Sequence, residues 1–277
     1  MDSMKSRLIT AAFGIPLVVI VFALGEFFHW IMYVLISLLS VLMVHELLSA
    51  KKLHSNLKIL IPCGLYAVLQ PILVGFNIGL FVLYIYLLVM FFIMILDNQN
   101  LTYTDISFAT LGTAIVTCGL SAILILPHAY GSYFTFFFVF AIGVPWFSDS
   151  GAFFAGVFLG KHKLCPRVSP NKTVEGFVGG IFAGTLSSLI IAFVFSLVFS
   201  ELYFNYGLVL LVGLSVSVVS VLGDLSFSLV KRSCGIKDYG SIFPGHGGFL
   251  DRFDSVIFSA PIIYFVGSFL PLFSIGA

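Results

Sequence analysis

Long apolar segments alternate with short polar ones along the whole of this chain. A transmembrane helix needs about 20 predominantly apolar residues, and runs near that length recur from one end of the sequence to the other. Hydrophobic residues make up 60% of the chain and charged residues only 9%, far below the roughly 25% charged share of soluble domains. The sequence therefore predicts an all-α, polytopic transmembrane protein and excludes a soluble globular enzyme.

We expect about nine membrane-spanning helices. The first run follows Lys5 and Arg7, as a secretory signal would, but the many apolar runs after it make a first membrane helix the simpler interpretation. The expected spans are 8–25, 27–48, 57–75, 78–96, 106–127, 132–158, 173–199, 205–225 and 253–273.

The positions of the cations predict the orientation, because cytoplasmic loops are enriched in Lys and Arg. With the N-terminus in the cytoplasm, all thirteen Lys and Arg fall on the cytoplasmic side, and the loops assigned to the outside hold none. We therefore expect a cytoplasmic N-terminus and an external C-terminus. We divide the chain into residues 1–105, with spans one to four, and a catalytic region 106–277, with spans five to nine and cytoplasmic loops 160–172 and 226–252.

Four acidic residues lie inside spans or near their ends. Asp149 falls inside the sixth apolar run and Asp224 ends the eighth, although an ionised side chain at a helix centre costs about 2.5–3.5 kcal/mol or more. Asp251 and Asp254 share a face if the ninth helix begins there. Such acids suit a hard divalent cation. The alternatives are a span drawn too long, a structural pair with a loop cation, or ordinary first-turn acids.

Two cytoplasmic loops, at 160–176 and 228–254, combine cations with Gly, Pro and Ser, which suits phosphate binding. The glycines of "PGHGG" would let backbone amides approach a ligand, unless they only form a turn. Ser169 before Pro170 predicts a helix N-cap, and a helix N-terminus can bind an anion. In the alternative interpretation, the loop cations only orient the protein and contact lipid headgroups. The four cysteines are too scattered to suggest a disulfide framework or a zinc site.

The stretch "SLVKRSCGIKDYGSIFPGHGGFLDRFD", residues 228–254, resembles the signature of the phosphatidate cytidylyltransferases, also called CDP-diacylglycerol synthases. The blocks "SDSGAFFAG" and "SPNKTVEG" resemble the same family, whereas the N-terminal half is similar only in hydropathy. Phe227 and Val221 depart from the family's pattern, in which Glu and Gln are frequent at those positions. The resemblance implies that CTP and phosphatidic acid give CDP-diacylglycerol and pyrophosphate.

That reaction implies Mg²⁺ as cofactor, with the number of ions left open, and cations that hold phosphates. We expect Asp224 and Asp251 to be the leading metal ligands, with Asp149 and Asp254 as further candidates for ligation or nucleotide contact. Catalytic candidates are Asp224, Asp251, Lys231, Arg232, Lys237, Arg252 and His246, and substrate-binding candidates are Ser169, Asn171, Lys172, Thr173, Asp149, Gly247, Gly248 and Asp254.

The expected partners are CTP, phosphatidic acid and membrane lipids, and no nucleic acid. The family implies a homodimer, and the expected location is the plasma (inner) membrane with the site facing the cytoplasm. Two other classes stay open on the residues alone. A CTP-dependent lipid kinase would transfer the γ-phosphate instead, and an ion-coupled transporter would show interrupted helices in two repeated halves.

Overall fold

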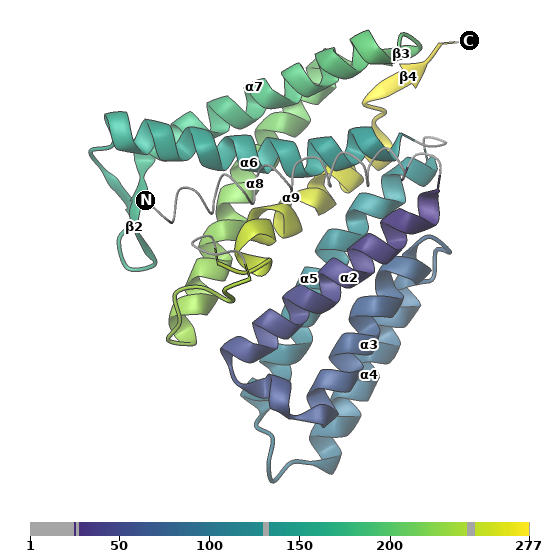
Figure 1. The fold of residues 1–277 in the computed structure, drawn as a ribbon, viewed down its shortest axis with the longest axis vertical. Helices are drawn as coiled ribbons and strands as arrows, with labels where there is room; N and C mark the ends of the chain where they lie inside the picture. Colours follow the sequence, from purple (N-terminus) through teal and green to yellow (C-terminus); the bar gives the residue numbers. More distant parts are fainter. Residues whose placement is uncertain (1–24, 26–27, 130–132, 243–246, 277) are drawn as a thin grey trace.

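The structure, a computed structural model, describes residue 25 and residues 28–129, 133–242 and 247–276 (Figure 1). The expected span at 8–25 lies outside these residues, except for Gly25. Long helices form along the apolar runs because a segment that spans a lipid bilayer must satisfy its backbone hydrogen bonds internally. The helices are α2 His29–Ala50, α3 Leu57–Val74, α4 Gly79–Leu96, α5 Tyr103–Ala129, α6 Phe134–Leu159, α7 Val174–Val198, α8 Tyr206–Ser233 and α9 Leu250–Phe269.

Seven of these helices, α2 to α8, are long and apolar enough to cross a membrane. The helix α9 has 20 residues, but Asp251, Arg252 and Asp254 lie in its first turns. A polytopic helical fold is thus confirmed, while the ninth span and the orientation of the termini stay predictions.

Two small antiparallel sheets, which the sequence analysis did not predict, add to this mostly helical fold. The strands β1 Lys163–Cys165 and β2 Ser169–Thr173 form a hairpin between α6 and α7. The strands β3 Leu202–Phe204 and β4 Phe273–Ile275 pair the α7–α8 connection with the segment after α9. Figure 1 shows the two sheets at opposite ends of the protein. The end of α9 therefore lies beside the α7–α8 connection, as the expected alternation of spans requires.

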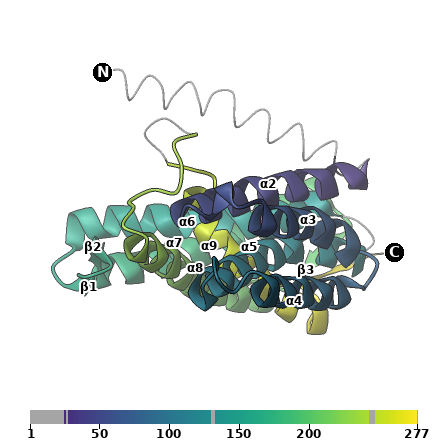
Figure 2. The ribbon, with the colours of Figure 1, turned by 90° about the horizontal axis from the view of Figure 1, so that it is seen from below.

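The helix α9 lies at the centre of the bundle. It contacts α2 and α5 on one side and α6 and α8 on the other, and Figure 2 shows it among these helices from below. The N-terminal end of α6 packs against the β3–β4 sheet through aromatic rings. The ring centroid of Phe136 lies 5.1 Å from that of Phe204 and 5.4 Å from that of Phe273. Edge-to-face and tilted rings at such separations are favourable arrangements.

The helices α6 and α7 approach each other closely along a row of small residues. A Cβ added to Gly176 would lie 2.7 Å from the Ala152 carbonyl oxygen, and one added to Gly180 would lie 2.9 Å from the Ser148 carbonyl oxygen. Small residues permit such backbone approach in membranes. Gly176 and Gly180 are therefore helix-packing residues.

The ends of two elements differ from expectation. The helix α8 continues to Ser233, so Asp224 does not end it but lies about 13 Å before its last residue at 1.5 Å per residue. With 28 residues, α8 is about 42 Å long and exceeds the hydrocarbon core of about 30 Å.

Ser169 and Pro170 lie in β2 and do not start a helix. The N-cap of α7 is Thr173, whose side chain accepts the Gly176 N–H.

The orientation can be tested with single cysteines in a variant that lacks the four native ones. Lys163 on β1, Lys237 in the loop after α8 and Glu201 just before β3 are all exposed. We expect a membrane-impermeant maleimide to label cysteines at Lys163 and Lys237 only from the cytoplasm, and one at Glu201 only from outside. Labelling of all three from the same side would overturn the expected topology.

Candidate active site

Asp224 lies inside α8 and meets a lysine from the β1–β2 hairpin. Lys172 Nζ, on β2, donates to Asp224 Oδ2. Ser228 Oγ, one turn farther along α8, donates to Asp224 Oδ1 over 3.2 Å. The side chains of Lys172 and Asp224 keep 26% and 24% of their surface exposed. A ligand can therefore reach both charges.

Asp149 and Asp254 join Asp224 to form what we call the acidic cluster. Ser255 Oγ donates to Asp149 Oδ2 over 3.2 Å, and the Ser255 N–H donates to Asp254 Oδ1 over 2.7 Å. Both acids lie within electrostatic range of Asp224. Asp254 is buried, and α6 continues past Asp149 to Leu159, so Asp149 lies within a helix whether or not it lies within the hydrocarbon. Three carboxylates therefore gather between α6, α8 and α9, where they repel unless cations lie among them.

Asp251 has a different set of contacts, which hold the loop between α8 and α9. Its Oδ1 accepts from Lys231 Nζ over 2.7 Å, with the two side chains only 5% and 11% exposed. Its Oδ2 accepts the N–H groups of Tyr239 and Gly248 over 2.8 and 2.9 Å. Gly247 has φ +82°, a conformation that favours glycine. The Gly248 amide that could approach a phosphate is thus already bound by Asp251.

Tyr239 fixes the same loop to α8 from the other side. Its hydroxyl donates to the Phe227 carbonyl oxygen over 3.2 Å, and Lys231 Nζ lies 5.5 Å from its ring centroid. Burial raises the pKa of the Tyr239 phenol, so it stays protonated as a donor. Lys231 is therefore held by a carboxylate and an aromatic face.

Two glutamates that the sequence analysis missed also shape the site. Glu46, on α2, is buried and accepts the N–H groups of Phe249 and Leu250 over 3.1 and 2.8 Å. Glu175, in the first turn of α7, accepts the Lys161 N–H over 3.0 Å and contacts His162 Nδ1 at 2.6 Å, which closes the base of the hairpin. The signal for Glu46 was available, because it is an acid inside an expected span.

The remaining candidates lie mostly on the surface of the β1–β2 hairpin, of the loop between α8 and α9, and of the adjoining ends of those two helices. Arg232 Nη1 donates to the Ile236 carbonyl oxygen over 3.2 Å. Thr173 is buried as the α7 N-cap, so its position gives it a structural role. His246 lies outside the described residues. The side chains of Asn171, Lys237 and Arg252 are exposed, and Ser169 is partly exposed.

The acidic cluster suits Mg²⁺ in its ligand chemistry, because hard cations prefer carboxylate oxygens. Among the described residues, however, no three His, Cys, Asp or Glu side chains are arranged to enclose a metal ion by themselves. Mg²⁺ is usually held by one or two carboxylates together with substrate phosphates. The residues therefore fit an ion whose shell a nucleotide completes, and they do not fit an all-protein metal cage.

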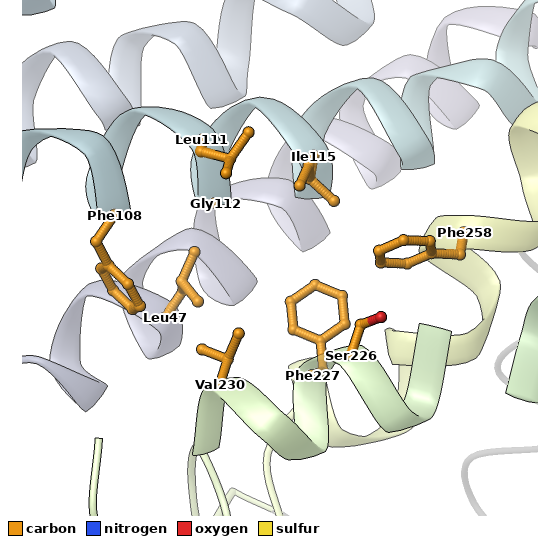
Figure 3. Close-up of a pocket in the computed structure, with 9 residues that line it drawn as sticks. All are labelled: Leu47, Phe108, Leu111, Gly112, Ile115, Ser226, Phe227, Val230 and Phe258. Atoms are coloured by element: carbon orange, nitrogen blue, oxygen red, sulfur yellow. The ribbon is translucent and has the colours of Figure 1, made fainter. Parts of the chain in front are cut away.

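An apolar cavity of about 140 Å³ lies between α2, α5, α8 and α9. Figure 3 shows the rings of Phe227 and Phe258 facing Leu111 and Ile115 across it. Phe227 is buried and stacks edge-on against Phe258, with centroids 5.9 Å apart. The departure from the family's pattern at this position therefore lies in an apolar wall.

These features define a helical membrane protein in which acids and lysines from three separate helices and a hairpin meet in one polar site. The model of the cytidylyltransferase family matches residues 5–270, and the chain belongs to that family.

The chain is also similar to individual phosphatidate cytidylyltransferases. The chain is 42% identical over 182 residues to a phosphatidate cytidylyltransferase of Bacillus subtilis, covering 65% of this chain and 64% of the relative. It is 38% identical over 169 residues to the phosphatidate cytidylyltransferase of Staphylococcus haemolyticus, covering 61% of this chain and 62% of that one. The alignments thus span less than two thirds of either relative.

Proposed function

We propose that this protein transfers cytidylate from CTP to phosphatidic acid, giving CDP-diacylglycerol and pyrophosphate for phospholipid biosynthesis. Membership of the cytidylyltransferase family and the names of the relatives support this reaction. One structural observation carries the proposal. Three blocks that are far apart in sequence meet around Asp224. Lys172 and Ser228 bond to its carboxylate, and Asp149 and Asp254 lie within electrostatic range of it and share Ser255 as a donor.

In the proposed reaction, an anionic oxygen of the lipid phosphate attacks the α-phosphorus of CTP. The bond from the α-phosphorus to the bridging oxygen breaks, and pyrophosphate leaves with that electron pair. The attacking oxygen is already deprotonated, so no general base is required. The protein must therefore align the two phosphates and neutralise their charge.

We assign these tasks to cations at the end of the bundle. Lys172 is accessible and lies at the acidic cluster, and Arg252 is exposed on the first turn of α9 and within electrostatic range of Asp149. Arg suits bidentate phosphate contacts. Lys231 is buried against Asp251, so we assign it to holding the loop that presents Arg252, and Arg232 and Lys237 to outer phosphate contacts.

We propose that Mg²⁺ bound with the nucleotide supplies charge neutralisation at the phosphates. The contacts favour Asp224, with Asp149 or Asp254, as its ligands. Asp251 was expected to share the ion with Asp224, but its carboxylate is engaged by Lys231 and two amides. Joint ligation by Asp224 and Asp251 stays a prediction, and the acidic cluster is the better-supported alternative.

The substrates suggest where the site faces. Phosphatidic acid lies in the bilayer and CTP in water, so a site near the polar end of α8 and α9 would be accessible to both. We propose that this end faces the cytoplasm at the plasma membrane, as the thirteen cations suggest, and that the protein works as a homodimer, as the family resemblance suggests.

The function is tested with CTP labelled at the α- or the γ-phosphate, phosphatidic acid and Mg²⁺ in detergent micelles. We expect the α-label in the lipid product and the γ-label in pyrophosphate. A CTP-dependent lipid kinase would instead place the γ-label in the lipid and release CDP. Absence of lipid-linked cytidylate would overturn the proposal.

A further inference from the structure

We propose that Glu46, on α2, is a positioning residue that holds the N-terminal end of α9 and so sets where Asp251, Arg252 and Asp254 lie. Its carboxylate bonds to the N–H groups of Phe249 and Leu250, more than 200 residues later in the chain. Glu46 as a whole is 5% exposed. The catalytic consequence rests on the proposed function, whereas the contact itself can be tested without it.

The backbone at the start of α9 requires such a partner. The first N–H groups of a helix have no acceptor within the helix, and the N-cap residue Phe249 provides no side-chain cap. Asp251 accepts the Gly248 N–H, and Glu46 accepts the next two. Three consecutive amides are thus satisfied by two carboxylates, and negative charge is favourable at this end of a helix.

The loop is also shaped to fit this carboxylate. A Cβ added to Gly240 would lie 2.5 Å from Glu46 Oε1, and one added to Gly248 would meet both Glu46 oxygens. Two separate points of the loop between α8 and α9 therefore lie directly against Glu46. Any larger residue at either point would displace the carboxylate or the loop.

The position of α9 matters because its first turns carry an exposed cation and a member of the acidic cluster. Arg252 and Asp254 follow the amides that Glu46 binds by only a few residues. Loss of the bonds would let this turn shift while the rest of α9 stays packed against α5, α6 and α8. A misplacement of about 1 Å at a catalytic group can lower a rate by about 100-fold.

The test compares Glu46→Gln with Asp105→Asn. Gln keeps the length of the side chain, but it loses the charge and presents an NH₂ group to one of the two amides. Asp105 is a matched control at the same end of the bundle. It accepts the Thr102 N–H over 3.3 Å at the start of α5 and pairs with Lys51 Nζ over 2.7 Å, and its hydrogen bonds and ion pair within the described residues join α5 to α2 and to its own N-terminal turn.

Two measurements decide the outcome. Amide hydrogen exchange should become faster in Glu46→Gln at whichever of Phe249 and Leu250 faces the new NH₂ group, because no helical carbonyl replaces the lost acceptor, and should stay unchanged at both in Asp105→Asn. For CDP-diacylglycerol formation per folded molecule, kcat and kcat/KM should fall together by about 10- to 100-fold in Glu46→Gln. Asp105→Asn should retain normal kinetics.

Unchanged exchange at both amides in Glu46→Gln would overturn the proposal, and so would faster exchange with normal kcat. If Glu46→Gln does not fold, Gly240→Ala keeps the charge but displaces the carboxylate, and the same two outcomes apply to it. Should the wild-type protein form no CDP-diacylglycerol, the proposed function fails, and the exchange data alone decide whether Glu46 holds α9.

Discussion

Replacing Asp224 with Asn is expected to lower the rate of CDP-diacylglycerol formation by about 100-fold or more, the scale of losing one electrostatic group in an active site. Asn keeps the size and one oxygen but loses the charge that holds Lys172 and suits a cation. Lys172→Met should have a loss of similar size. The double variant should be little worse than either single one, because groups that act as a unit are not additive.

The measurement is the initial rate against Mg²⁺ concentration for all three variants, with Asp238→Asn as the control. Asp238 is exposed in the loop between α8 and α9, so its variant should retain most activity. Asp254→Asn and Asp251→Asn extend the series. Only the variants of metal ligands should require more Mg²⁺. Near-normal rates with unchanged Mg²⁺ dependence in Asp224→Asn would exclude Asp224 as a ligand.

Lys231→Met is expected to lower the free energy of unfolding by about 3–5 kcal/mol, because it leaves a buried carboxylate without its partner. Asp251 would keep the two backbone donors but lose the lysine. The double variant Lys231→Met/Asp251→Asn should be less destabilised than Lys231→Met alone, since no unpaired charge remains. Denaturant titration in mixed micelles measures both changes.

Lys58→Met is the matched control for this cycle. Lys58 is 63% exposed and pairs with Asp97 over 2.7 Å, and its hydrogen bond lowers the pKa of the Asp97 carboxyl. The Lys58 side chain is exposed, although that of Asp97 is only 10% exposed, so this pair should contribute less than one covered on both sides, and Lys58→Met should lose clearly less free energy of unfolding than Lys231→Met. Equal effects of Lys231→Met and Lys58→Met would contradict the structural role of the Lys231–Asp251 pair.

The helices could be predicted from the sequence because membrane burial imposes long apolar runs. The ends of the helices could not be predicted in the same way, because polar residues mark where a helix leaves the hydrocarbon and not where the helix ends. The last turns of α8 contain Lys231 and Arg232 and therefore resembled a loop, yet Lys and Arg are good helix formers. At Ser169 the local cap signal was overridden by pairing of β2 with β1, where Pro170 needs no donor at an edge.

The kinds of residue in the site could be predicted, but their partners could not. Asp149, Asp224 and Asp254 were noted as acids in an apolar setting, and the structure brings them together. Lys172 and Asp224 are 52 residues apart, and no spacing rule links a hairpin to the middle of a later helix. Asp251 fitted a metal ligand by residue type, whereas its contacts with Lys231 and two amides depend on the folded loop.

The contact between Glu46 and the start of α9 also bears on how the protein is made. Glu46 lies 203 and 204 residues before Phe249 and Leu250. The helices α2 to α8 must therefore be synthesised before the contact can form. Contacts between distant segments form late because the intervening chain must first be ordered. At about 5–20 residues per second, the earliest helices would wait in the bilayer for tens of seconds, with Asp149 and Asp224 made only later in that interval and Asp254 not yet present. Nascent chains halted before Leu250 should therefore be inserted but inactive, and catalytic competence should arise abruptly when the last helix docks.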